Sequence, residues 1–175
     1  KAFGIYHPYA DAERLRLLSL SGQSWRKDSN PEDEGAAGET APEVREAQQL
    51  ADRLLEEYRK DMYILLYCGE ARWAAGRREE AYGIWKEILE ENPDHYTAKY
   101  GVARYLIAEE EYEEAKELMM DLLNMDGRDE AVLEDMRKTN EALIARYRAS
   151  AAQPDLDEAK RCRDTVELGW CLFQN

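Results

Sequence analysis

The chain has 175 residues, of which 44% are hydrophobic and 35% charged, enough apolar side chains for one folded domain or one stacked array. Its 38 acidic and 24 basic residues give a net charge of −14, which disfavours nucleic-acid phosphates and favours basic or apolar protein partners. We find no apolar run long enough to span a bilayer and no signal-peptide pattern, so no membrane association is expected. The three cysteines are widely separated and odd in number, which fits reduced thiols and a cytoplasmic setting.

The N-terminal part of the chain predicts a short helix, a linker and a second helix. Residues 1–21 form an N-terminal helical segment, with the helix running from about Tyr9 to Leu20. Residues 22–41 are rich in Gly, Pro, Ser and acids, which is typical of a flexible linker without regular structure. Thr40 and Glu43 then match a capping box, with Pro42 in the first turn, and predict a helix over residues 43–59.

From Asp61 to the end, apolar residues recur at helical spacing. The pattern is interrupted at Gly76, at residues 92–94, at residues 126–127 and at residues 153–154. Strand-like alternation of apolar and polar residues is absent from the sequence. The sequence therefore predicts an all-α fold.

Two segments repeat one pattern at an interval of 34 residues (96 − 62 = 34). Residues 62–95 read MYILLYCGEARWAAGRREEAYGIWKEILEENPDH, and residues 96–129 read YTAKYGVARYLIAEEEYEEAKELMMDLLNMDGRD. Each segment predicts two antiparallel helices with small residues where the backbones approach and a large apolar residue in the seam. Each pair leaves an apolar face uncovered, so neighbouring pairs must stack to bury it.

The first of these segments resembles the tetratricopeptide repeat (TPR) family. Leu65, Gly69, Ala81, Trp85 and Pro93 fall on the spacing of the family signature. The second segment keeps the pattern less closely, and its packing residues are Ala103, Ala115 and Met119. The resemblance implies a TPR-like α-solenoid of stacked antiparallel helix pairs; the alternative is an ordinary helical bundle with accidental periodicity.

We predict a repeat domain over residues 42–175. Its units are residues 42–61 (partial), 62–95, 96–129, 130–161 (irregular) and 162–175 (truncated). Residues 129–150 form one long helix, or two with a break near Asn140. Leu168 and Gly169 repeat the pattern of a first helix, and no second helix follows them in the chain.

In the TPR family, one side of each first helix lines a concave groove that holds peptides. The resemblance implies that the equivalent side chains here are groove residues: Tyr63, Leu66, Tyr67, Glu70, Trp73, Tyr100, Arg104 and Ile107. Trp73 and Ile107 could equally pack one unit against the next. Some TPR proteins clamp an acidic chaperone tail with Lys and Asn, but here the clamp positions are Leu66, Glu70, Gly101, Glu134 and Asp135. No such clamp is expected.

The sequence nominates no catalytic residue, metal ligand or cofactor. His7 and His95 are far apart, and Cys162 and Cys171 are nine residues apart, which suits neither a redox pair nor a zinc site. We therefore predict a non-catalytic scaffold that binds a protein or peptide, as part of a larger protein. The alternatives are a substrate-holding arm of a chaperone, since the sequence loosely resembles TPR arms of bacterial J-domain proteins, and a regulatory domain of an enzyme or transcription regulator.

Overall fold

The computed structural model describes residues 7–28, 42–152 and 158–174, and every regular element within them is an α-helix. The helices are α1 (Pro8–Asp28), α2 (Pro42–Tyr58), α3 (Met62–Ala74), α4 (Arg78–Glu91), α5 (Tyr96–Ala108), α6 (Tyr112–Met125), α7 (Glu130–Ala151) and α8 (Glu158–Gln174). They form two compact units, residues 1–101 and residues 102–175. The prediction of an all-α fold is confirmed.

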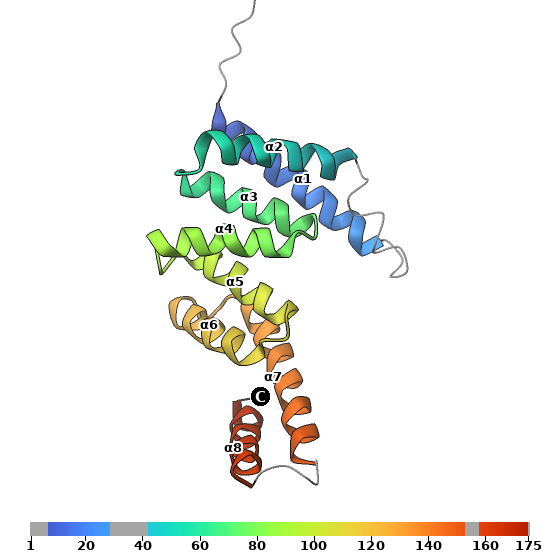
Figure 1. The fold of residues 1–175 in the computed structure, drawn as a ribbon, viewed down its shortest axis with the longest axis vertical. Coiled ribbons are helices and arrows are strands. Elements are labelled where there is room, and N and C mark those ends of the chain that lie inside the picture. Colours follow the sequence, from blue (N-terminus) through green and yellow to red (C-terminus); the bar gives the residue numbers. More distant parts are fainter. Residues whose placement is uncertain (1–6, 29–41, 153–157, 175) are drawn as a thin grey trace, which may run out of the picture. The chain divides into compact units, whose positions relative to one another are not determined.

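In the first unit, α1 packs against both α2 and α3, α2 packs against α3, and α3 packs against α4 (Figure 1). α1 buries Ala12, Leu15 and Ser19, which share one helical face because they are three and four residues apart. α2 buries its own stripe of Val44, Ala47, Leu50, Ala51 and Leu54. The N-terminal segment is thus a full packing partner of α2 and α3.

The predicted end of the first helix at about Leu20 is wrong, because α1 continues to Asp28. Residues 21–28 (SGQSWRKD) contain one Gly and no Pro, so nothing in them terminates a helix already packed on two neighbours. The first part of the predicted linker is therefore helical. Residues 29–41, with Thr40 of the predicted capping box, lie outside the described residues.

The 34-residue period recurs in the helix boundaries and in their caps. α3 spans 62–74 and α5 spans 96–108, while α4 spans 78–91 and α6 spans 112–125, so each boundary is shifted by 34. Asp61 caps α3 by accepting hydrogen bonds from the backbone N–H groups of Tyr63 and Ile64, and Asp129 caps α7 through Ala131 and Val132. Midway between them, His95 Nδ1 accepts from the Ala98 N–H of α5 at 3.3 Å.

The turns inside the two repeats also match. Gly76 has φ 83° and Glu110, 34 residues later, has φ 62°, and both close their turns in the left-handed region. The next residues donate back into the preceding helix, Arg77 N to Arg72 O and Glu111 N to Leu106 O, both at 2.9 Å. The same turn therefore has a glycine at its left-handed position in the first repeat and a glutamate there in the second.

In the second unit, α6 packs against α7 and α7 packs against α8. α7 is one helix of 22 residues, which decides between the two predicted possibilities for residues 129–150. Leu168 of α8 packs on the buried Leu143 and Ile144 of α7, so α8 forms a helix pair with α7. This pairing differs from the prediction, in which residues 162–175 begin a further, truncated unit; the remaining unit boundaries stay predictions.

Candidate functional site

Three tyrosines from α1 and α3 form a row on the first unit, which we call the tyrosine row: Tyr9, Tyr63 and Tyr67. The ring centroids of Tyr63 and Tyr67 are 4.7 Å apart at 72°, and those of Tyr9 and Tyr63 are 5.5 Å apart at 77°. Both contacts are edge-to-face, which is a favourable arrangement for aromatic rings. Tyr9 is 46% exposed and Tyr63 is 43% exposed, while Tyr67 is half-buried. His7 extends the row, with its ring 5.7 Å from that of Tyr9.

One carboxylate holds the start of this row in place. Asp61 Oδ1 caps α3, accepting from the N–H groups of Tyr63 at 3.0 Å and Ile64 at 3.2 Å. Asp61 Oδ2 accepts from the Tyr9 hydroxyl at 2.8 Å, and this hydrogen bond raises the pKa of Tyr9. The same side chain therefore fixes the N-terminus of α3 and ties α1 to it.

Two hydroxyl groups of the row, those of Tyr9 and Tyr67, have pKa values raised above the ordinary tyrosine value. A side-chain hydrogen bond with Tyr63, together with partial burial, raises the pKa of Tyr67 to about 12. Glu13 and Arg16 of α1 act on Tyr67 in opposite directions, and they pair with each other at 2.9 Å. The row thus presents prearranged aromatic rings beside an ion pair whose two charges balance each other.

Among the predicted groove residues, Tyr63 and Tyr67 are in direct ring contact. Leu66, Glu70 and Tyr100 of the same unit are half-buried. The ring centroid of Trp73 lies 5.7 Å from that of the buried Trp85. The Arg78 guanidinium lies 5.7 Å from the centroid of the Trp73 ring. These contacts favour the packing role for Trp73.

Arg104 and Ile107, also predicted for the groove, are half-buried and belong to the second unit. The structure therefore does not join them to the tyrosine row. Sequence reasoning missed His7 and Tyr9, because α1 precedes the recognisable repeats and no spacing relates it to α3.

The residues predicted to pack the repeats lie in the interior, apart from one at a turn. Leu65, Gly69, Ala81, Trp85, Ala103, Ala115 and Met119 are all buried, and Pro93 is exposed. A Cβ atom built on Gly69 would lie 2.6 Å from Trp85 Nε1, and one on Gly101 would lie 2.4 Å from Trp85 Cδ2. The role of Gly101 was missed, because the 34-residue register assigns the small position of α5 to Ala103.

Comparison with known proteins bears on the family and the fold class. Residues 72–134 match the tetratricopeptide repeat family. We call these matched residues the TPR region. Among solved structures, the chain is similar to the MamA RS-1 ArsTM double mutant, with a TM-score of 0.51 and 17% identity over 92% of this chain and 84% of that chain. No curated protein matches the chain.

At 17% identity the structural likeness shows the fold alone. Together with the match over residues 72–134, it confirms the resemblance inferred from the sequence and the predicted fold class. The fold is all-α, a TPR-like α-solenoid of stacked antiparallel helix pairs. TPR folds are typically non-catalytic scaffolds for protein interaction, so the general function class is supported as well.

The TPR region begins at a buried arginine that ties three helices of the first unit together. Only 3% of the Arg72 side chain is exposed, and its guanidinium forms an ion pair with Asp52 of α2. Its Nε lies 3.5 Å from Glu80 Oε2 of α4, and its guanidinium also donates to Gln48 of α2. Gln48 in turn donates to the Ala71 carbonyl at 3.1 Å. This network is structural, since its groups are engaged with one another.

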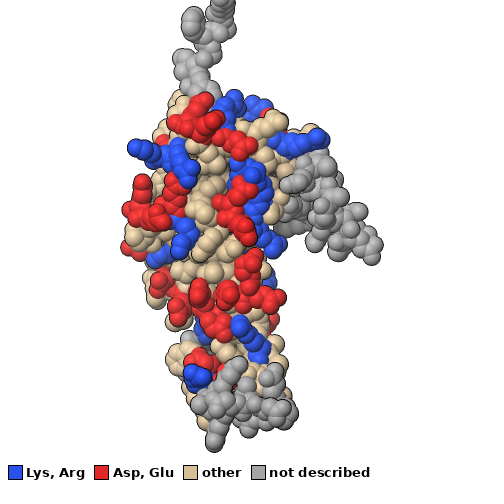
Figure 2. Space-filling model, viewed as in Figure 1, with Lys and Arg blue, Asp and Glu red and all other residues tan. Residues whose placement is uncertain are grey.

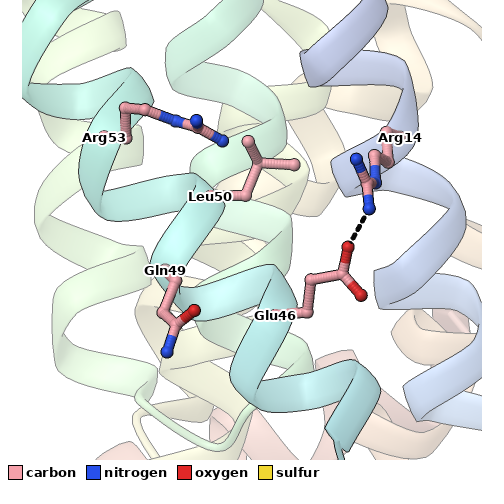
Figure 3. Close-up of a pocket in the computed structure, with 5 residues that line it drawn as sticks. All are labelled: Arg14, Glu46, Gln49, Leu50 and Arg53. Carbon is pink, nitrogen blue, oxygen red and sulfur yellow. Dashed lines mark hydrogen bonds and ion pairs between the residues drawn. The ribbon is translucent and has the colours of Figure 1, made fainter.

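A surface pocket of about 360 Å³ lies between α1 and α2, outside the TPR region (Figure 3). Its lining residues are Arg14, Glu46, Gln49, Leu50 and Arg53. An ion pair between Arg14 and Glu46 joins the two helices across it. Apart from Leu50 the lining side chains are exposed, so the pocket is a hollow of the surface and not an enclosed site.

The described residues contain no group of three or more His, Cys, Asp or Glu side chains that could hold a metal ion. Burial raises the pKa of the Cys68 thiol to about 12, which keeps it protonated and unreactive. Within the described ranges, no helix combines the length and apolar character needed to cross a membrane.

Proposed function

We propose that this chain is a non-catalytic interaction scaffold that binds a peptide segment of a partner protein on the tyrosine row. The observation that carries the proposal is the row itself: two rings exposed by 46% and 43% and held in edge-to-face contact on a TPR-like fold. Tyrosine offers a large amphipathic surface with few rotatable bonds, and such residues are enriched among interface hot spots.

Prearrangement supports a binding role for the row. The hydrogen bond from Tyr9 to Asp61 and the edge-to-face contact between Tyr63 and Tyr67 restrict the rings before any ligand arrives. The fold already restricts these rings, so little conformational entropy is lost when a ligand binds, and this favours affinity. Leu66, Glu70 and Tyr100, which belong to the same unit, are proposed as flanking contacts, whereas Arg104 and Ile107 stay predicted groove residues of the second unit.

The partner we propose is basic or apolar, because the chain carries a net charge of −14. For a short peptide on this surface we expect roughly micromolar affinity, about −8 kcal/mol. Binding of an acidic chaperone tail is not proposed, and the cytoplasmic setting inferred from the cysteines stays a prediction.

A phage-displayed library of random peptides, selected on the full chain, tests the proposal. Binding of the selected peptides is then measured for the parent and for the Tyr63→Ala and Tyr67→Ala variants. Tyr82→Ala is the matched control, because Tyr82 is a half-buried tyrosine of α4 that lies beneath the Lys86 ammonium at 5.8 Å. We expect each row variant to weaken binding by about tenfold or more, a loss of at least ~1.4 kcal/mol.

The proposal is wrong if the row variants keep their circular dichroism spectrum and bind every selected peptide as tightly as the parent. It is also wrong if Tyr82→Ala weakens binding as much as they do.

A further inference from the structure

The second unit carries a pocket that the tyrosine row does not involve. α6, α7 and α8 surround a space of about 440 Å³, which lies within the range of about 300–1,000 Å³ common for ligand pockets. All three helices belong to residues 102–175, so the pocket is formed within one unit. Its lining combines aromatic, thioether and carboxylate groups.

Much of the apolar lining is open to solvent although it is built from large side chains. Trp170 of α8 is 52% exposed and Met120 of α6 is 41% exposed. Tyr147 of α7 is half-buried, and its hydroxyl donates to Glu113 Oε1 of α6 at 3.0 Å. Glu113 also accepts from Arg146 at 3.2 Å, so its charge is compensated and it serves to hold the tyrosine ring.

Two further carboxylates face this pocket without compensation. Glu117 of α6 and Glu167 of α8 line it, and neither forms a hydrogen bond or ion pair with another described residue. Lys116, the basic residue of the lining, is 9% exposed and already engaged in an interaction of its own. The pocket therefore offers aromatic faces and negative charge together.

The surface around the pocket is also negatively charged. Figure 2 shows acidic side chains gathered over α6 on the face in view. The segment that leads into and through this helix supplies Glu109, Glu110, Glu111, Glu113, Glu114, Glu117 and Asp121, against Lys116 alone. Such a field attracts cations and raises the rate at which a basic ligand arrives.

We infer that this pocket binds an arginine side chain of a partner protein. A guanidinium group is planar and weakly hydrated, so it can stack on the indole of Trp170 while its N–H groups reach a carboxylate such as Glu167. Its fork of donors suits carboxylate acceptors better than the single ammonium of lysine does. The methylene stem can meanwhile lie against Met120.

The inference rests on the proposed function only in treating the chain as protein-binding. The pocket and the tyrosine row are separate surfaces in different units, so either one can fail in experiment without the other.

The test is a titration of the full ¹⁵N-labelled chain with the capped peptide acetyl-Gly-Arg-Gly-amide. The matched probe is the same peptide with citrulline, which keeps the planar shape but carries no charge. We expect the arginine peptide to shift the indole resonance of Trp170 and the amide resonances around Glu117 and Glu167, and to saturate. The citrulline peptide should bind about tenfold more weakly.

Variants separate the pocket from the general field. Glu117→Gln with Glu167→Gln should weaken the arginine peptide by about tenfold, since two exposed ion pairs are removed. The control, Glu114→Gln with Glu130→Gln, removes equal charge from exposed side chains of α6 and α7 outside the lining, and should change affinity less than about twofold. Trp170→Ala should weaken binding, and Trp170→Phe should restore part of it.

Equal binding of the arginine and citrulline peptides would overturn the inference. So would equal losses in the two double variants, or saturable shifts confined to residues outside α6, α7 and α8. If the corresponding lysine peptide binds more tightly than the arginine peptide, the pocket prefers lysine, and the inference is likewise contradicted.

Discussion

Single residues decide how closely the helices of this chain approach. Trp85 of α4 is 0% exposed, and its indole ring lies against the backbone at Gly69 of α3 and at Gly101 of α5. A tryptophan ring can fit there because both neighbouring positions lack a Cβ atom, which would stand within 2.6 Å of the ring at one and 2.4 Å at the other. The ring is surrounded by protein, so it has little freedom to move aside.

We therefore expect Gly69→Ala and Gly101→Ala to destabilise the chain, each by about 1–3 kcal/mol, through overpacking against Trp85. Gly83→Ala is the control, because a Cβ atom there meets nothing within 4 Å and Gly83 lies in the middle of α4. Alanine favours the helix over glycine by about 0.5–1 kcal/mol, so this variant should be more stable than the parent. Urea unfolding followed by circular dichroism measures all three; a stabilised Gly69→Ala or Gly101→Ala would contradict the packing described.

The tyrosine row predicts a pH dependence. The pKa of Tyr67 is raised to about 12 in the folded chain, against an ordinary value of 10.0, and the hydrogen bond with Tyr63 is the largest cause. A raised pKa means that the folded state holds the proton more tightly, so this contribution to stability is full below pH 10 and is lost as the pH rises toward 12.

Tyrosinate absorbance of the parent, compared with that of Tyr67→Phe, isolates the titration of Tyr67. Tyr63→Phe should move that titration down toward the ordinary value, because the hydrogen bond is lost. A titration of Tyr67 that stays in place in Tyr63→Phe would show that the two hydroxyls do not interact.

At the scale of whole elements, a buried cation joins α2, α3 and α4. Arg72 has 3% of its side chain exposed, whereas its partners Asp52 and Glu80 are 63% and 48% exposed. Removing the arginine should therefore cost a different amount of folding free energy from removing its two carboxylate partners. Removing the arginine leaves carboxylates that water can solvate, but removing the carboxylates leaves a buried charge without compensation.

Asp52→Asn combined with Glu80→Gln should accordingly destabilise the chain more than Arg72→Met does. We expect a loss of about 1–3 kcal/mol for the double variant, less than for a fully buried pair because the carboxylates are partly in water. Arg72→Met keeps most of the volume and should cost less than about 1.5 kcal/mol. Thermal and urea unfolding of both variants decide the order, and a costlier Arg72→Met would show that the ion pairs themselves dominate.

At the scale of the whole molecule, the net charge of −14 opposes the folded state, because folding brings like charges closer together. Salt screens this repulsion: the Debye length falls from about 30 Å at 0.01 M to about 8 Å at 0.15 M. The surface ion pairs present in the chain lose strength under the same conditions, but exposed pairs contribute little each. The net effect of salt should be stabilising.

We expect the melting temperature at pH 7 to rise by about 2–4 °C between 0.01 and 0.15 M sodium chloride, which corresponds to ~1 kcal/mol for a chain of this size. At a pH near the sequence pI of 4.7, where the net charge is close to zero, the rise should disappear. A melting temperature that falls with salt at pH 7 would mean that the ion pairs outweigh the repulsion.

The sequence by itself determined the repeated helix pairs of this protein. Boundaries, caps and turns follow local rules: apolar residues three and four apart mark a helical face, Asp61 and Asp129 each accept from the N–H groups two and three residues further along, and Gly76 adopts the left-handed conformation just after α3. These interactions join neighbours in the chain, so the 34-residue spacing was enough to predict one helix pair within residues 62–95 and another within residues 96–129, and with the family resemblance the TPR-like fold.

Only the tertiary structure decided which surfaces meet. The continuation of α1 to Asp28, its contact with α3 through Tyr9, and the pairing of α8 with α7 depend on residues far apart in the sequence, between which no periodicity runs. Gly101 is a packing residue because the Trp85 ring lies against its backbone, and the two carboxylates of the second unit's pocket, Glu117 and Glu167, lie 50 residues apart (167 − 117 = 50). Such contacts are selected by shape and burial in three dimensions, which local sequence patterns do not encode.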